Sequence, residues 1–288
     1  MMMTMMNNEP TIDLDAYQRR IGLDLGSRAA PTLATLARLI EHHARAIPFE
    51  NIEVMAGRVP ALDIGALQAK MLQQKRGGYC FEQNNLLRSC LLQLGYQVQR
   101  LEARVRAGVP AEVVTGRTHM ALRVTIDGVD HLADVGFGGM APVAPLELAS
   151  RGEQPAADGL YRFVDVEGDL LMQTRSHEGW ADCYRIAPAT AQHVDYEIGN
   201  WYVATHDRAF LGQNLLVARA TDEGRLTLCN EQLTLRRPGV REHEQRTLEH
   251  RTEFAEVLVD AFGLALDDAE IDAVMALMER RALASGNG

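Results

Sequence analysis

The spacing of apolar residues changes twice along this chain of 288 residues. Between residues 12 and 95 the apolar positions recur at the spacing of one face of an α-helix. Between 96 and 195 they alternate with polar positions, as on a β-strand with one buried face, and from 196 to 288 both patterns occur. The sequence therefore predicts an α+β fold with an N-terminal helical bundle, a central antiparallel β-barrel or sheet, and a C-terminal α/β lid. Residues 1–11, which are rich in methionine, are expected to form a disordered leader.

Capping and turn residues set the expected limits of the elements. Asp63 is suited to cap a helix, and Asp127-Gly128 and Glu167-Gly168 are suited to tight hairpin turns. Helices are expected over 31–47, 63–74, 80–94, 252–264 and 267–281. Strands are expected over 97–105, 118–126, 129–137, 160–166, 169–175, 181–186, 214–220 and 224–237.

Charge and cysteine spacing exclude several classes of protein. The net charge of -10 disfavours a broad nucleic-acid-binding surface, because an acidic surface repels phosphates. Of 29 basic residues only Lys70 and Lys75 are lysines, and neither lies in a phosphate-binding loop motif. The four cysteines lack the paired spacing of a zinc site or a disulfide framework, so we expect no metal and a reducing, cytoplasmic location. No stretch approaches the ~18 apolar residues of a membrane span, so we expect no membrane association.

The segment RGGYCFEQN, residues 76–84, contains the strongest candidate for a catalytic residue. Cys80 stands at the expected start of a helix, where free backbone N–H groups and the helix dipole favour a thiolate over a thiol. The two glycines let the backbone approach a ligand and leave N–H groups that can hold an oxyanion. Cys80 is therefore the candidate nucleophile, and the alternative is a small buried hydrophobic residue. For the other three cysteines, which stand among apolar or strand residues, we prefer a packing role: Cys90, Cys183 and Cys229.

A nucleophilic cysteine requires a base, and histidine is the side chain whose pKa suits that task. Among nine histidines, His119 opens an expected strand directly after a loop, where a rigid side chain can lie at the edge of a cleft. His131 and His193 are not excluded by this criterion. The remaining six are expected on the solvated surface: His42, His43, His177, His206, His243 and His250.

Asp134 is the candidate for a third side chain that orients the histidine and supports its charged form. It lies in the apolar stretch HLADVGFGG, where an unpaired buried charge is costly. Residues 119 and 134 are near mirror positions about the expected turn at Asp127-Gly128, so both can lie at similar height on neighbouring strands. The alternative for Asp134 is a turn aspartate before glycine-rich backbone.

Five segments of the chain, taken in their order, resemble the arylamine N-acetyltransferase family. They are IPFENIEV (47–54), RGGYCFEQN (76–84), THMALRV (118–124), LADVGFGG (132–139) and IGNWYVATHDRAFLGQNLLVAR (198–219). The resemblance runs from about residue 12 to the C-terminus. It implies a cysteine-protease-like core in which Cys80 accepts the acetyl group, His119 is its base and Asp134 orients the histidine.

The same resemblance implies residues for ligand binding. Those implied for the acceptor substrate are Phe49, Phe137, Phe210 and Thr118, and those implied for coenzyme A are Thr115, Gly116 and Gly138. Glu50 and Arg76 match a structural ion pair of the family and are assigned no chemical role. The segment ATHDRA at 204–209 replaces the family's Ser-Thr-x-Pro-x-Ser, so the chain departs from the family where hydroxyl groups would contact the coenzyme or the acceptor.

The implied reaction is acetyl transfer from acetyl-CoA to arylamines, arylhydrazines or N-hydroxyarylamines, in a ping-pong mechanism through acetyl-cysteine. The implied partners are coenzyme A and a small aromatic amine or hydrazine, and homo-oligomerisation is left open. The residues alone also allow a papain-like or transglutaminase-like cysteine amidase, which uses the same order of Cys, His and Asp. A binding protein with a degenerate site is the other alternative.

Overall fold

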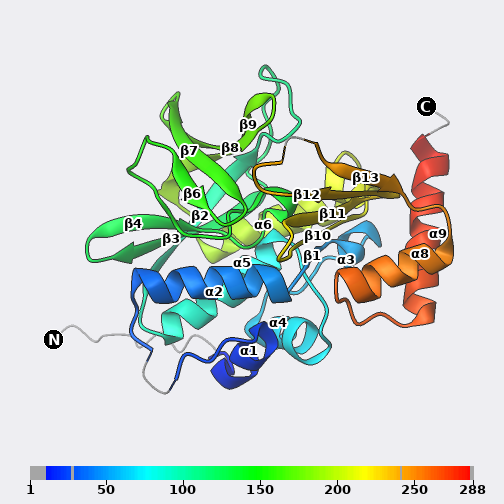
Figure 1. Cartoon of the computed structure of the whole chain (residues 1–288), viewed down its shortest axis with the longest axis horizontal. Helices are drawn as coiled ribbons and strands as arrows, with labels where there is room; N and C mark the ends of the chain where they lie inside the picture. The colour runs from blue at the N-terminus through cyan, green and yellow to red at the C-terminus, as the bar shows by residue number, and fades with distance from the viewer. Residues whose placement is uncertain (1–10, 27–28, 241, 286–288) are drawn as a thin grey trace.

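The computed structural model describes residues 11–26, 29–240 and 242–285. Apart from Thr11, the predicted leader at 1–11 lies outside these described residues. The described chain begins with a group of helices, drawn in blue and cyan in Figure 1. Their bounds are α1 Leu14–Ile21, α2 Leu33–Ala46, α3 Ile52–Met55, α4 Ile64–Gln68, the π-helical η1 Ala69–Gln73, and α5 Cys80–Gln93.

Side-chain caps define where α1, α2 and α4 begin. The side chains of Asp13, Thr32 and Asp63 each accept a hydrogen bond from the backbone N–H three residues later, at 2.9, 3.2 and 2.9 Å. The cap at Asp63 was predicted and is confirmed. Each cap satisfies one of the N–H groups that the first turn of a helix leaves without an intrahelical partner.

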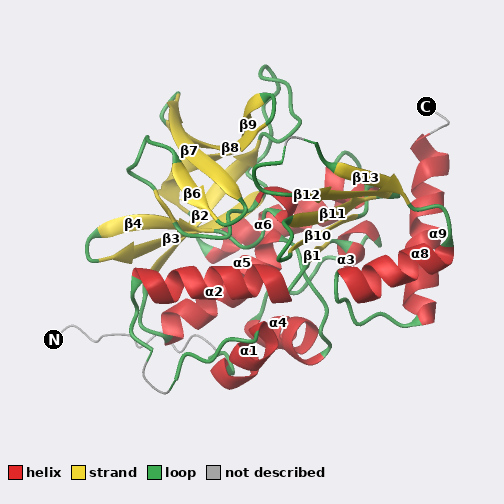
Figure 2. Ribbon diagram, viewed as in Figure 1, coloured by secondary structure: helices red, strands yellow, loops and turns green. Residues whose placement is uncertain are grey.

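Eight antiparallel strands form a nearly closed barrel, shown in yellow in the upper left of Figure 2. In chain order they are β2 Gln97–Val105, β3 His119–Ile126, β4 Val129–Ala133, β5 Leu146–Glu147, β6 Gln154–Ala156, β7 Gly159–Val166, β8 Asp169–Ser176 and β9 Gly179–Thr190. The strand order in the sheet is β5-β4-β3-β2-β9-β8-β7-β6. At the seam between β5 and β6, the side-chain amide of Gln154 bonds both the N–H and the carbonyl of Glu147, at 2.7 and 3.1 Å. The interior is apolar, with Phe163 and Met172 fully buried.

Two hairpin turns of the barrel have the geometry that the sequence predicts. Asp127 and Gly128 have φ values of 50° and 81° between β3 and β4, and Glu167 and Gly168 have φ values of 51° and 85° between β7 and β8. Two successive residues with positive φ are typical of the tight turns that match the twist of antiparallel strands. The turn at 127–128 fixes the register in which β3 and β4 meet.

A second, five-stranded antiparallel sheet pairs one strand from the N-terminal third of the chain with four strands from the C-terminal third. Its strands are β1 Phe49–Glu50, β10 Leu216–Ala220, β11 Arg225–Cys229, β12 Gln232–Arg236 and β13 Glu244–Thr247, in that order. The helices of this part are α6 His193–Thr205, α7 Phe210–Gln213, α8 Arg251–Glu256, the π-helical η3 Val257–Ala261, and α9 Asp268–Ser285. Phe49 pairs with Ala218 in the ladder between β1 and β10. Figure 1 shows α8 and α9 beside this sheet, away from the barrel.

Helix α5 packs against β2 and β3 and is buried on nearly all sides. Its first turns carry polar side chains that are nevertheless buried, namely Glu82, Gln83, Asn84 and Asn85. Buried polar groups of this kind require hydrogen-bond partners from neighbouring elements. The start of α5 is therefore the place where a polar site is built into the interior.

The structure corrects two of the predicted helices, two of the predicted strands and one of the predicted surface residues. The strand expected over 129–137 ends at Ala133, and the segment 224–237 forms two strands, β11 and β12. The helices expected over 63–74 and 252–264 each end in a π-helical turn, η1 and η3. His43 was expected on the solvated surface but is fully buried. It lies one turn after Leu39 and Ile40 on the buried face of α2, and the charged residues around it in the sequence concealed this position.

The other cysteines are placed as a packing role requires. Burial raises the pKa of Cys90 to about 12, and it also raises the pKa of Cys183. Cys229 is half-buried, and burial raises its pKa as well. Within the described ranges, none of the helices is long and apolar enough to cross a membrane.

Candidate active site

Cys80 is the first residue of α5 and is buried. The loop of residues 76–79, which we call the nucleophile loop, leads into it. The carboxylate of Glu82 accepts the backbone N–H of Tyr79 at 3.0 Å and so caps the helix. The prediction that Cys80 stands at the start of a helix is confirmed.

The two glycines of the nucleophile loop pack closely on β1. A Cβ atom on Gly77 would lie 2.2 Å from the carbonyl oxygen of Pro48 and 2.8 Å from Cγ of Glu50. The N–H of Gly78 donates to the Pro48 carbonyl at 3.3 Å, and the N–H of Glu50 donates to the Gly78 carbonyl at 3.1 Å. The loop is thereby fastened to β1 and the second sheet. The predicted use of these glycine N–H groups for an oxyanion is wrong for Gly78, because its N–H already has a partner.

His119 and Asp134 meet beside Cys80. Nε2 of His119 lies 2.7 Å from Oδ2 of Asp134, and the two side chains are 2% and 0% exposed. Cys80 lies close enough to the imidazole to help raise its pKa. The sulfur of Cys80 also lies 3.8 Å from the carbonyl oxygen of Thr118. The three residues predicted as nucleophile, base and orienting acid therefore form one cluster.

The β3–β4 hairpin brings the histidine and the aspartate together. His119 is the first residue of β3, and Asp134 directly follows β4. Leu122 pairs with Ala133 in the ladder, so the two side chains come from positions close in height on neighbouring strands. The near mirror relation about the 127–128 turn is the sequence feature that indicated this.

Sequence reasoning missed three groups that hold Asp134. Its Oδ1 accepts from Nδ2 of Asn84 at 2.9 Å and from the N–H of Gly136 at 2.8 Å. Its Oδ2 accepts from the hydroxyl of Tyr184 at 2.8 Å. Asn84 stands four residues after Cys80, and that helical spacing was a usable signal, whereas nothing near Tyr184 in the sequence indicates its partner.

Gly136 also allows a close approach to Cys80. A Cβ atom on Gly136 would lie 2.7 Å from Cα of Cys80 and 2.8 Å from Nδ2 of Asn84. The backbone after β4 therefore packs directly on the first turn of α5. A side chain at this position would force the aspartate and the cysteine apart.

The charges in the cluster explain the protonation states. Burial alone lowers the pKa of His119, but the charge and hydrogen bond of Asp134, helped by Cys80, outweigh it and raise the pKa to about 10. The pKa of Asp134 lies below its usual value despite burial, because His119 and the hydrogen bonds from Asn84 and Gly136 outweigh desolvation. Both directions describe an imidazolium–carboxylate pair at neutral pH. An imidazolium beside a sulfur is the kind of group that stabilises a thiolate.

Aromatic rings line one side of the cluster. The ring centroid of Phe137 lies 4.8 Å from that of His119 and 4.7 Å from that of Tyr184, both edge to face. The ring centroids of His119 and Tyr184 are 4.7 Å apart. Phe49 is buried close by, since a Cβ atom on Gly138 would lie 3.7 Å from its Cγ. These residues form an apolar wall next to Cys80.

The remaining predicted ligand-binding residues lie in less enclosed positions. In the loop before β3, the hydroxyl of Thr115 donates to the Val105 carbonyl at 2.8 Å, and Gly116 is exposed. Thr118 contributes its carbonyl oxygen beside Cys80. Phe210 begins α7, and its side chain is 58% exposed, so it does not belong to the buried wall.

The two histidines that the sequence left open do not replace His119. His131 is buried on β4, where its Nδ1 lies 3.2 Å from the Val129 carbonyl of the same strand. His193 is the first residue of α6 and is half exposed beside Glu197. Among the residues that the structure describes, no group of three or more His, Cys, Asp or Glu side chains could hold a metal ion.

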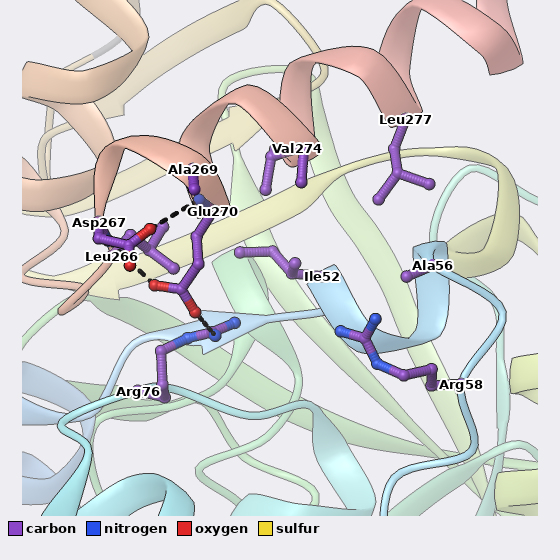
Figure 3. A pocket seen from close by; sticks show the side chains of 11 residues that line it. Ile52, Ala56, Arg58, Arg76, Leu266, Asp267, Ala269, Glu270, Val274 and Leu277 are labelled. Carbon is purple, nitrogen blue, oxygen red and sulfur yellow. Dashed lines mark hydrogen bonds and ion pairs between the residues drawn. The ribbon is translucent and has the colours of Figure 1, made fainter.

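Neither of the next two surface cavities is lined by a residue of the cluster. One, of about 470 Å³, is lined by residues 106–110 together with Met140, Ala181 and Asp182. The other, of about 310 Å³, lies between α3 and α9. Figure 3 shows Arg76 of the nucleophile loop at one end of this second cavity, joined to Glu270 of α9.

The fold and the cluster together define a class. An α+β protein that buries a cysteine at a helix start against an imidazolium–carboxylate pair is typical of enzymes that form a covalent bond to the cysteine. Within that class, comparison with known proteins identifies the family.

A family model described as N-acetyltransferase matches residues 32–271. The arylamine N-acetyltransferase of Mycolicibacterium smegmatis is 35% identical over 267 residues, which cover 89% of this chain and 94% of the relative. The arylamine N-acetyltransferase / N-hydroxyarylamine O-acetyltransferase of Salmonella typhimurium is 35% identical over 257 residues, covering 86% and 91%. The solved structure of Mycobacterium marinum arylamine N-acetyltransferase in complex with CoA is 34% identical, with a TM-score of 0.85 over 91% of this chain and 98% of that one. The chain belongs to the arylamine N-acetyltransferase family, whose members are acyltransferases.

Proposed function

We propose that this protein transfers an acetyl group from acetyl-CoA to the nitrogen of arylamines, arylhydrazines or N-hydroxyarylamines through an acetyl-cysteine. The observation that carries the proposal is the contact of Cys80, His119 and Asp134 in one buried cluster of a family member. The CoA complex of the Mycobacterium marinum relative supports the donor, and the names of the relatives support the acceptor class.

In the first half-reaction the sulfur of Cys80 attacks the carbonyl carbon of the acetyl thioester. The bond from the acetyl carbon to the CoA sulfur breaks, and the departing CoA thiolate takes the proton that the His119 imidazolium carries at neutral pH. One thioester replaces another, so the step is close to thermoneutral. Asp134 remains ionised and holds the imidazole in place throughout.

In the second half-reaction the amine nitrogen attacks the acetyl-cysteine. Acetylation removes the negative charge of Cys80, which helps to raise the pKa of His119, so this pKa falls once the acetyl-enzyme has formed. Neutral His119 then takes a proton from the attacking nitrogen, the carbon–sulfur bond breaks, and the Cys80 thiolate returns beside the imidazolium. The amide product is more stable than the thioester, which drives the reaction forward.

The apolar wall favours transfer of the acetyl group to an amine over its hydrolysis. Phe49 and Phe137 offer aromatic surface to the acceptor ring and restrict water, the competing nucleophile. We assign Thr118 and the more exposed Phe210 to the outer part of the acceptor site. We assign Thr115, Gly116 and Gly138 to coenzyme A. Arg106 holds the loop that precedes Thr115 and Gly116 by donating to the Pro110 carbonyl at 2.7 Å.

Intact-mass measurement tests the proposal. After mixing with acetyl-CoA alone, the wild-type mass should rise by ~42 Da, the mass of one acetyl group held in the covalent intermediate. Cys80→Ala should show no increase, and addition of an arylamine should return the wild-type mass to its starting value. No adduct in the wild type, or the same adduct in Cys80→Ala, would refute the mechanism.

The cysteine amidase alternative is separated by its substrate. A casein or glutamine-donor assay without CoA should give no turnover if the protein is an acetyltransferase.

A reactive free cysteine favours the cytoplasm as the location of the protein, because the cytoplasm keeps thiols reduced. The division into a helical part at 12–95, a barrel at 96–195 and a lid at 196–288, and homo-oligomerisation, stay predictions.

A further inference from the structure

The loop that carries Phe137 places an aromatic ring beside the cluster. This loop, which we call the wall loop, comprises residues 137–143 between β4 and β5 and contains the 3₁₀ turn η2 Gly138–Met140. The ring of Phe137 packs on that of His119, with the centroids 4.8 Å apart, and Met140 lines the surface cavity of about 470 Å³. The position of the wall loop therefore shapes both the wall beside His119 and this cavity.

The wall loop has few side chains of its own with which to hold its position. Gly138 and Gly139 are its second and third residues, and a glycine has no side chain that could act as an anchor. A Cβ atom on Gly139 would lie 2.7 Å from Oγ1 of Thr227 on β11, so the loop packs closely on the second sheet. Contacts from outside the loop therefore fix its place.

Arg225, the first residue of β11, and Asp158, directly before β7, supply such contacts. The guanidinium of Arg225 donates through Nη1 to the Gly138 carbonyl at 3.5 Å and through Nη2 to the Ala141 carbonyl. Nη2 also pairs with Oδ2 of Asp158 at 2.6 Å. Oδ1 of Asp158 accepts the backbone N–H of Val143 at 3.1 Å. The ion pair thus holds the wall loop at three of its residues.

Burial of this ion pair indicates that it does more than stabilise the fold. The side chains of Arg225 and Asp158 are 6% and 8% exposed. Desolvation of two buried charges offsets much of their attraction, so such a pair adds little net stability by itself. The planar fork of a guanidinium can reach a carboxylate and two separate carbonyl groups at once, whereas an ammonium is one compact point. Both properties point to a role in placing the loop that the pair contacts.

We propose that Arg225 and Asp158 are positioning residues that hold the wall loop, with Phe137, against the cluster, and so decide how acetyl-Cys80 divides between an aromatic amine and water. This inference rests on the proposed function. An aromatic acceptor gains contact with the Phe137 ring, and a closed wall keeps water from the thioester. Attack by water breaks the same carbon–sulfur bond as attack by the amine, but it releases acetic acid and returns the thiol.

The groups that carry out acetyl transfer are held separately from the wall loop. Asp134 accepts hydrogen bonds from Asn84 of α5, from the N–H of Gly136 and from Tyr184 of β9. Each of these donors lies outside residues 137–143. Loosening the wall loop should therefore weaken acceptor binding and admit water without disabling Cys80.

Deacetylation of the preformed acetyl-enzyme tests the proposal. The acetyl-enzyme is prepared with acetyl-CoA and freed of CoA, and its loss is followed by intact mass with increasing aniline and in buffer alone. Arg225→Lys keeps the charge opposite Asp158 but replaces the fork. We expect the aniline concentration for half-maximal rate to rise about tenfold, the upper range for loss of an aromatic contact. Hydrolysis in buffer should rise several-fold, while acetylation at saturating acetyl-CoA stays within about threefold of wild type.

Arg185→Lys is the matched control. Arg185 lies on β9, its side chain is 22% exposed, and it pairs with Glu167 and Asp169 on the barrel. The same exchange of side chains there should leave aniline dependence, hydrolysis and acetylation at wild-type values. Circular dichroism checks the fold of each variant.

A second pair of variants moves the wall loop without touching the ion pair. Gly139→Ala places a Cβ atom against Oγ1 of Thr227, a β-branched side chain that is stiff at χ1, and should give the same rise in half-maximal aniline concentration. Combining it with Thr227→Ala removes Oγ1 and should return that concentration to within about twofold of wild type. Thr227→Ala alone should match the wild type. These variants decide the question even if Arg225→Lys does not fold.

Unchanged aniline dependence and hydrolysis in folded Arg225→Lys or Gly139→Ala would overturn the proposal. So would a defect in Gly139→Ala that Thr227→Ala does not relieve, or an equal defect in Arg185→Lys. A missing acetyl adduct in the wild type would refute the proposed function itself. An adduct that forms normally but divides between aniline and water as in the wild type, in every variant, would refute this inference alone.

Discussion

His119 and His43 are buried to the same degree but are held in opposite protonation states. Asp134 contacts His119, and the pKa of that imidazole rises to about 10. His43 contacts the hydroxyl of Tyr17 and the amide of Gln83, both at 2.8 Å, and desolvation lowers its pKa to about 4. The partner, and not the burial, decides whether a buried histidine is a cation.

The two histidines serve α5 in different ways. His43 belongs to a series of uncharged hydrogen-bonding side chains, which we call the neutral chain. In it the Tyr17 hydroxyl donates to Nδ1 of His43, and the Nε2–H of His43 donates to the side-chain oxygen of Gln83. The Gln83 amide then donates to the Gly78 carbonyl in the nucleophile loop at 2.9 Å. The charged pair lies beside Cys80, while the neutral chain supports the backbone that leads to it.

Replacing Asp134 by Asn should make the surroundings of His119 like those of His43. The pKa of His119 should fall, and acetyl-enzyme formation should slow by roughly 10³- to 10⁴-fold, as expected when an imidazole loses its orienting carboxylate. Single-turnover mass spectrometry with acetyl-CoA measures the rate, and circular dichroism checks the fold. A rate within tenfold of wild type would remove Asp134 from the mechanism.

Acid should destabilise the neutral chain before the charged pair. The pKa of His43 is lower in the folded protein than in the unfolded chain. Neutral His43 therefore stabilises the fold above the unfolded-state pKa of about 6.5, and this contribution is lost as the pH falls toward 4. Across this window the free energy of unfolding of wild type should fall by about 3 kcal/mol more than that of His43→Gln. Urea unfolding at several pH values measures the difference. The exposed His177→Gln serves as control, and equal slopes for wild type and His43→Gln would contradict the prediction.

Gln83→Glu should give His43 a carboxylate partner of the kind that His119 has. We expect the pKa of His43 to rise by about 2 units, the usual effect of an opposite charge at hydrogen-bond distance. An NMR titration of the imidazole signals measures it, with the exposed Gln97→Glu as control. A pKa that remains near 4 would mean that the partner rule does not hold at this site.

Tyr184→Phe should weaken the charged pair slightly. The change removes the hydroxyl that donates to Asp134 at 2.8 Å but keeps the ring against His119 and Phe137. Loss of one hydrogen bond to a charged group should lower the acetylation rate about tenfold. Tyr161→Phe removes a similar bond to Asp158 at 2.9 Å in the barrel and should leave the rate unchanged. Equal effects of both changes would point to general destabilisation.

The sequence predicted those parts of the site that depend on local pattern. The change of apolar period, the 127–128 turn and the glycines before Cys80 locate the helix start and the hairpin that carry the three candidate residues. The partners that come from distant segments had no such signal. Tyr184 belongs to a strand fifty residues after Asp134, and two-residue β1 has no periodicity to reveal its pairing with β10. Charged neighbours in α2 concealed the burial of His43.

The contact of Gly77 with the Pro48 carbonyl has a consequence for mutational scanning. The clash at 2.2 Å would involve Cβ, the first atom of any side chain, and a backbone oxygen, so no choice of rotamer relieves it. At Gly78 the nearest atom is Cβ of Glu82 at 3.0 Å, so the conflict there is milder. In a library of all codons at both positions, position 77 should retain function only with its synonymous glycine codons, whereas position 78 should tolerate alanine at reduced fitness.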